Sequence, residues 1–186
     1  DIRESLLTRS RNPKYLPWCY LDREFFTPSS DINEVVRDAD IVILAMPSAF
    51  LKKFLDPLTV SLEDKIVVSA VKGIIPGDYL TIIEHMNRFY DVPMQNLAVV
   101  TGPSHAEEVG QCQLSYLTIA SEDNNTAELV RDVLSNEYFR CSISNDVLGV
   151  EVAAIMKNVY ALAVGIAVGL RYGDNFLSVL ISCCAC

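Results

Sequence analysis

The sequence predicts an α/β protein with a doubly wound, mostly parallel sheet, and two observations support this. Short apolar runs rich in β-branched residues occur at 41–46, 66–71, 97–100 and 116–120. Unbroken runs of this kind are typical of strands that are buried on both faces of a parallel sheet. Segments with helical or turn signals separate them, and alternation of strands with helices is the pattern of a doubly wound sheet.

Helix signals lie between and after these runs. Asp31-Ile-Asn-Glu34 resembles a capping box with Asp31 as the N-cap, and Ser48 is placed to cap a helix that follows it. Two further helices are expected over 76–90, which has a proline at its start, and over the amphipathic segment 125–135.

The stretch 147–170 is apolar except for two charged residues, Glu151 and Lys157. We expect a long helix capped by 144–146, and a helix that is apolar on all sides is normally buried. Burying an unpaired ammonium costs several kcal/mol or forces the group to lose its proton. A lysine kept in such a place is a candidate for proton transfer at neutral pH.

Two other interpretations of Lys157 remain open at this point. The side chain can extend from the edge of the helix to water. The segment 152–170 is also about long enough to span a bilayer. A lysine inside such a span costs about 2.5–3.5 kcal/mol, and the rest of the chain has the pattern of an α/β protein, so we expect no membrane insertion.

Composition narrows the class of protein. A chain of 186 residues suits one domain plus part of another, and a hydrophobic fraction of 51% argues against disorder. The net charge of −9 argues against nucleic acid as a partner, although a local positive site can still bind a small anion. The six cysteines show no metal-ligand spacing apart from a C-x-x-C at 183–186 that lacks further ligands, so no metal site is expected.

Ligands of doubly wound sheets bind beyond the carboxyl ends of the strands. We therefore expect one crevice formed by the residues that follow the strands: Pro47, Ser48, Lys72, Gly73, Gly102, Ser104, His105 and Ala106.

Five motifs follow one another along the chain. They are Ala39-Asp-Ile-Val-Ile-Leu-Ala-Met-Pro-Ser48, Ser69-Ala-Val-Lys-Gly73, Thr101-Gly-Pro-Ser-His-Ala-Glu-Glu108, Ile155-Met-Lys-Asn-Val159 and Gly173-Asp-Asn175. In this order the chain resembles the NAD(P)-dependent glycerol-3-phosphate dehydrogenases, in their bacterial form, from about residue 11 to 182. The resemblance implies hydride transfer between glycerol 3-phosphate and dihydroxyacetone phosphate with NAD or NADP, in the cytoplasm and with a possible homodimer.

The resemblance also implies residue roles. Lys157 is the expected proton acceptor. Lys72 is expected to contact both substrate and cofactor. Gly102 and Ser104 are expected to line the substrate site, whereas Ala106 and Phe50 are expected to contact the cofactor.

Each of these roles has a simpler alternative. Without the motif, Lys72 would be a solvated turn lysine, and Gly102 and Ser104 would be turn formers. Phe50 would be a core residue of its helix.

The chain also departs from the family pattern. It begins with Asp1 and contains no Gly-x-Gly-x-x-Gly turn for a cofactor pyrophosphate. We expect an incomplete Rossmann-like domain over 1–142 and the start of an all-α substrate-binding domain over 143–186, with little activity in this chain alone. A related hydroxy- or keto-acid dehydrogenase and a non-catalytic binding remnant are the alternatives.

Overall fold

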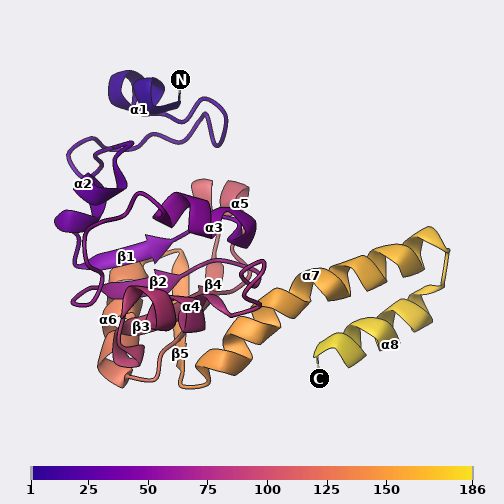
Figure 1. Cartoon of the computed structure of the whole chain (residues 1–186). Helices are drawn as coiled ribbons and strands as arrows, with labels where there is room; N and C mark the ends of the chain where they lie inside the picture. Colours follow the sequence, from indigo (N-terminus) through magenta and orange to yellow (C-terminus); the bar gives the residue numbers. More distant parts are fainter. Residues whose placement is uncertain (1, 186) are drawn as a thin grey trace.

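The computed structural model describes residues 2–185 and contains one five-stranded sheet with helices on both faces (Figure 1). The strands lie in the order of the chain: β1 (Ile41–Leu44), β2 (Ile66–Ser69), β3 (Leu97–Thr101), β4 (Ser115–Ala120) and β5 (Phe139–Ser144). All neighbouring pairs are parallel except β3 and β4, which are antiparallel. The predicted α/β fold with a mostly parallel sheet is confirmed.

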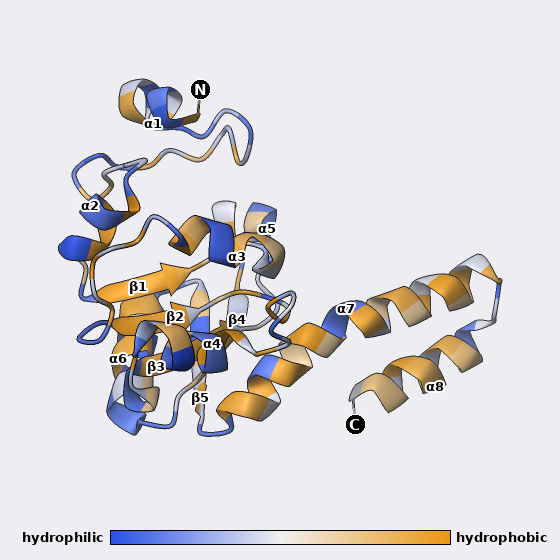
Figure 2. Ribbon diagram, in the orientation of Figure 1, coloured by the Kyte–Doolittle hydropathy of each residue, from blue (hydrophilic) through white to orange (hydrophobic). Residues whose placement is uncertain are grey.

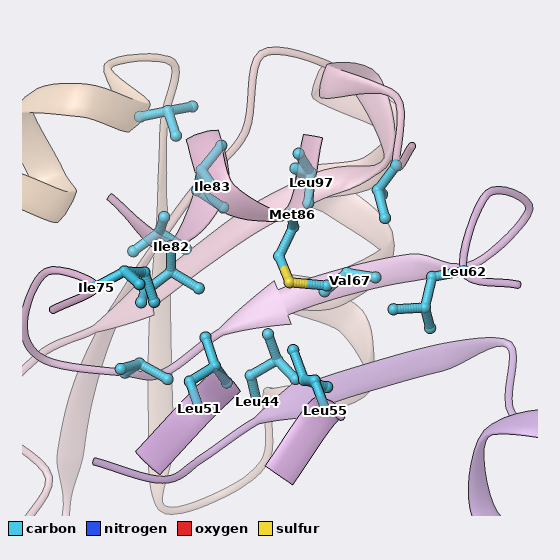
Figure 3. Close-up of a cluster of buried hydrophobic side chains, with 14 of the residues drawn as sticks. Leu44, Leu51, Leu55, Leu62, Val67, Ile75, Ile82, Ile83, Met86 and Leu97 are labelled. Carbon is cyan, nitrogen blue, oxygen red and sulfur yellow. The ribbon is translucent and has the colours of Figure 1, made fainter. Parts of the chain in front are cut away.

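The described helices are α1 (Ile2–Arg9), α2 (Ile32–Arg37), α3 (Ser48–Leu55), α4 (Ile82–Tyr90), the 3₁₀ turn η1 (Met94–Asn96), α5 (Ala106–Gly110), α6 (Asn124–Leu134), α7 (Val147–Gly169) and α8 (Asp174–Ala185). Side chains of α3, α4 and the start of α7 form the larger core on one face of the sheet, part of which Figure 3 shows. Side chains of α6 form a second core on the other face. Burial on both faces explains why the strands read as unbroken apolar runs.

The caps predicted for α2 and α3 form only in part. Asp31 does cap α2, because its carboxylate accepts a hydrogen bond from the Asn33 N–H at 2.9 Å. Glu34 instead accepts from the Ser29 hydroxyl at 2.5 Å, so the predicted capping box does not form there. Ser48 is the first residue of α3, and Pro47 occupies the cap position without a side-chain bond.

Helix α4 begins six residues later than the predicted start at Pro76. Gly77 and Tyr79 have left-handed backbone angles, with φ of 89° and 56°, and such residues interrupt a helix. Thr81 then starts α4 through a capping box with Glu84.

The long helix α7 forms as predicted, and the Asp146 carboxylate caps it by accepting from the Gly149 N–H at 2.8 Å. The predicted burial is wrong, because most of α7 is exposed in this chain and so is Lys157. Only the start of α7 packs against the sheet, and the rest extends away from it beside α8 (Figure 1). Figure 2 shows that both helices are largely hydrophobic in this outlying region.

Strand β5 was missed by the sequence prediction. Its residues Phe-Arg-Cys-Ser-Ile-Ser alternate between apolar and polar types, which suits a partly exposed edge strand rather than a buried one. The predicted domain junction between 142 and 143 falls inside β5, and the division itself stays a prediction. Of the C-x-x-C at the end of the chain, Cys183 and Cys184 lie in α8, whereas Cys186 lies outside the described residues.

His85 is a buried titratable residue on the inner face of α4, with 3% of its surface exposed. Its Nδ1 atom has no hydrogen-bond partner and lies 3.6 Å from Asp78 Oδ2, which pairs with Lys52 Nζ at 2.6 Å. Burial lowers the pKa of His85 below its usual 6.5, although the Asp78 carboxylate acts in the opposite direction.

We therefore expect His85 to make the protein less stable in acid. The unfolded chain binds a proton at His85 near pH 6.5, whereas the folded chain binds it only at lower pH, so stability is lost as the pH falls below 6.5. His85→Gln should flatten this part of the pH dependence of the free energy of unfolding, measured with urea. His105→Gln is the matched control, because it makes the same replacement at an exposed histidine that lies outside the core. Equal slopes in wild type and His85→Gln would contradict the assignment.

Candidate functional site

The ends of two strands and one face of α7 form a pocket of about 340 Å³. Lys72 follows β2, Gly102 follows β3, and Lys157 comes from α7. Thr101, Pro103, Ala153 and Ala154 complete the lining. Three residues to which the sequence assigned a role, from distant parts of the chain, thus meet at the carboxyl edge of the sheet, where ligands of such folds bind.

The turn that carries Lys72 depends on Gly73. Gly73 has φ of 141°, and a Cβ atom placed on it would lie 2.4 Å from Ser48 Oγ. A glycine is needed for the turn after β2 to approach the start of α3 this closely. The Pro-Ser and Lys-Gly motifs are therefore neighbours in space.

Gly102 permits a second close approach. Its φ is 150°, and a Cβ atom would lie 2.1 Å from the carbonyl oxygen of Tyr116 in β4. Because any side chain would collide with this backbone, only glycine lets the chain leave β3 along the path that lines the pocket.

The other residues predicted for the site line different hollows. Ser104 and Ala106 border a largely apolar pocket of about 340 Å³ on the second face of the sheet. Ser104 is linked to the first pocket through its hydroxyl, which donates to the Gly102 carbonyl at 3.4 Å. Phe50 borders a third hollow of about 500 Å³ with Lys53 and Phe54. The chain thus brings together Lys72, Gly102 and Lys157 but not all six residues.

The two lysines give the pocket its charge. Within residues 2–185 neither Lys72 nor Lys157 belongs to an ion pair, and both are exposed. Two unpaired ammonium groups at one pocket favour an anionic ligand. In the same described part of the chain, no group of three or more His, Cys, Asp and Glu side chains gathers as a metal site.

Sequence reasoning gave no role to Glu151, which is the buried charge of α7. Its side chain is 2% exposed, and its Oε1 accepts hydrogen bonds from the Ile82 N–H at 2.8 Å and the Ile83 N–H at 3.4 Å. Burial raises the pKa of Glu151, and hydrogen bonds from Thr81, Ile82 and Ile83 oppose this rise. A lone acidic residue near the start of an apolar helix was the available signal.

Among the described residues, α7 is the one helix that is long and apolar enough to cross a membrane, with 11% of its apolar window buried. Length and composition alone do not distinguish such a helix from one that packs against protein.

The fold is that of a Rossmann-like α/β protein, and its candidate site lies beyond the strand ends. The family model for the N-terminus of NAD-dependent glycerol-3-phosphate dehydrogenase matches residues 1–127, and the model for the C-terminus matches residues 146–185. The chain therefore belongs to the NAD-dependent glycerol-3-phosphate dehydrogenase family.

Individual relatives agree with this assignment. The glycerol-3-phosphate dehydrogenase (NAD(P)+) of Thermobifida fusca is 35% identical over 98% of this chain and 54% of its own length. That of Agathobacter rectalis is 40% identical over 84% of this chain and 46% of its own length. The chain thus spans about half the length of the curated relatives it matches.

Solved structures match the fold. DsGPDH of Dunaliella salina has a TM-score of 0.87 and 26% identity over 97% of this chain and 31% of its own chain. The glycerol-3-phosphate dehydrogenase of Coxiella burnetii has a TM-score of 0.84 at 24% identity, over 98% of this chain and 55% of its own.

We expect Gly102→Ala to destabilise the protein by about 2 kcal/mol or more, because the new Cβ collides with the Tyr116 backbone and the residue is held at positive φ. The free energy of unfolding in urea measures this loss. Gly77→Ala is the matched control, since Gly77 also has positive φ but nothing lies within 4 Å of its Cβ position. If both variants lost the same stability, the collision would contribute nothing.

Proposed function

We propose that the full-length protein containing this chain transfers hydride reversibly between sn-glycerol 3-phosphate and dihydroxyacetone phosphate, with NAD or NADP as the cofactor. The observation that carries the proposal is the meeting of Lys72, Gly102 and Lys157 at one pocket. Family membership and the names of the relatives support it.

In this proposal Lys157 is the general base. Its amine stands at the pocket without a carboxylate partner among residues 2–185, so a substrate hydroxyl can approach it. Lys157 acts here as the neutral amine: it accepts the proton of the C2 hydroxyl as glycerol 3-phosphate is oxidised, and the resulting ammonium returns a proton to the C2 oxygen in the reverse direction.

Lys72 supplies a fixed positive charge from the opposite element, the turn after β2. It contacts substrate and cofactor, and it stabilises the negative charge that develops on the C2 oxygen. Gly102 and Ser104 line the substrate side, where the hydrogen bond between them fixes the Ser104 side chain.

A bound nicotinamide cofactor would supply the hydride acceptor for C2. Lys72, Ala106 and Phe50 would hold it, and the surfaces fit that role: Phe50 is 54% exposed beside its hollow, and Ala106 is exposed at the start of α5. The 186 residues include no Gly-x-Gly-x-x-Gly turn for the pyrophosphate. We therefore expect little or no turnover from the 186-residue chain by itself.

The proposal extends to the cellular setting. The reaction supplies glycerol 3-phosphate for phospholipid synthesis in the cytoplasm, and the protein forms a homodimer. Helix α7 belongs in protein rather than in a membrane, because Glu151 is bound to the start of α4 and Lys157 lies in the middle of the apolar stretch.

The test is Lys157→Met in the full-length protein, which keeps the bulk of the side chain and removes the amine. NADH or NADPH oxidation with dihydroxyacetone phosphate should fall about a hundredfold or more. Lys14→Met, which changes an exposed lysine remote in sequence from the pocket motifs, is the control and should keep full activity.

Three other outcomes would contradict the proposal in different ways. Full activity in Lys157→Met would remove Lys157 from catalysis. Cofactor binding without turnover in wild type would favour a non-catalytic binding protein. Turnover of a different hydroxy or keto acid would favour a related dehydrogenase.

A further inference from the structure

The proposed reaction makes no use of Glu151, although it is a buried charge only six residues from Lys157. Both residues lie on α7, but they do different things: Glu151 is buried and bound to α4, whereas Lys157 is exposed at the pocket. A buried carboxylate is costly unless it is well hydrogen-bonded, so its partners indicate what it stabilises.

Besides the Thr81 side chain, these partners are the first backbone N–H groups of α4, which have no acceptor within their own helix. The local capping box satisfies two groups there: the Thr81 N–H donates to Glu84 at 2.9 Å, and the Glu84 N–H donates to the Thr81 hydroxyl at 3.3 Å. The two N–H groups between them, those of Ile82 and Ile83, donate to Glu151. The cap of α4 is therefore completed from 68 and 69 residues away in the sequence.

This bond sets the position of α7. Ala154 is three residues from both Glu151 and Lys157, so it neighbours each of them on the surface of the helix. Ala154 is 6% exposed and lines the pocket with Lys157. A helix rise of about 9 Å separates Glu151 from Lys157. The other side chains that join this part of α7 to the core, Val147 and Val150, are apolar and make contacts without direction. A hydrogen-bonded carboxylate at a helix N-terminus is directional and electrostatically favourable.

We propose that Glu151 is a positioning residue: its carboxylate fixes the rotation and the axial position of α7 against the start of α4, and so holds Lys157 at the pocket it shares with Lys72. The proposal rests on the function proposed above. A displacement of a reacting group by about 1 Å can cost about a hundredfold in rate, so this alignment matters for catalysis.

The test uses three variants of the full-length protein. Glu151→Ala should lower kcat roughly ten- to a hundredfold without raising KM for the cofactor, because the lysine and not the cofactor contacts are displaced. Glu151→Gln keeps a carbonyl acceptor for the Ile82 N–H and should recover most of the activity. Glu84→Ala is the matched control, because it removes the other carboxylate at this helix end, which accepts from the Thr81 N–H and only repels Glu151, and it should keep kcat.

Amide hydrogen exchange gives a second readout that needs no activity. Glu151→Ala should speed exchange at Ile82 and Ile83 and also in α7 around Lys157, whereas Glu84→Ala should leave α7 unchanged. Unchanged exchange in α7 overturns the proposal whatever the activity, and so does equal loss of kcat in Glu151→Ala and Glu84→Ala. Loss of wild-type turnover, or full activity in Lys157→Met, would instead count against the proposed function. If Glu151→Ala does not fold, exchange in Glu151→Gln decides, since its weaker acceptor should give a smaller increase at the same amides.

Discussion

The hydrogen bonds between the Glu151 carboxylate and the start of α4 join the two parts of this structure. Before Val147 the chain builds a sheet whose helices pack on it through apolar side chains. After Val147 it forms a helix that is apolar nearly all round, and such a helix can pack in many rotations with similar contact. The Glu151 carboxylate removes that freedom, because Ile82 and Ile83 present N–H groups that need an acceptor at one place. Helix α4 packs on the sheet, so its bond to Glu151 places Lys157 relative to the sheet edge that carries Lys72.

Two glycines, Gly73 and Gly102, fix the path of the backbone around the pocket. The Cβ position of Gly73 falls on the Ser48 side chain, and that of Gly102 falls on the Tyr116 backbone. The chain after β3 lies closer to the β4 backbone than a side chain at Gly102 would allow, and the turn after β2 lies against the Ser48 side chain. The pocket therefore lies where β2 and β3 end side by side, with Lys72 in the turn after β2 and Thr101 at the end of β3. Close backbone approach, rather than a large cavity, is what brings the motifs together.

The sequence predicted what depends on local patterns and missed what depends on distant partners. Buried parallel strands leave unbroken apolar runs, so β1 to β4 were found, whereas the alternating residues of the edge strand β5 were not. Of the six residues given a role from the motifs, Lys72, Gly102 and Lys157 line one pocket, and their roles stay predictions. The prediction that Lys157 is buried was wrong. An apolar composition indicates that a helix can pack against protein, but it does not show that this chain contains the surface that would cover the helix. The role of Glu151 depends on unpaired N–H groups almost 70 residues away, which no local pattern reveals.

The net charge of the chain differs in sign from the charge at the pocket. The chain carries a net charge of −9, yet its pocket holds two ammonium groups without ion-pair partners among residues 2–185. Other cations of the same described region, such as Lys52 and Arg131, are paired with Asp78 and Asp132. At physiological ionic strength the screening length is about 8 Å, so carboxylates beyond that distance contribute little to the potential at the pocket. No carboxylate lines this pocket, so its two lysines favour an anion locally although the net charge of the chain is negative.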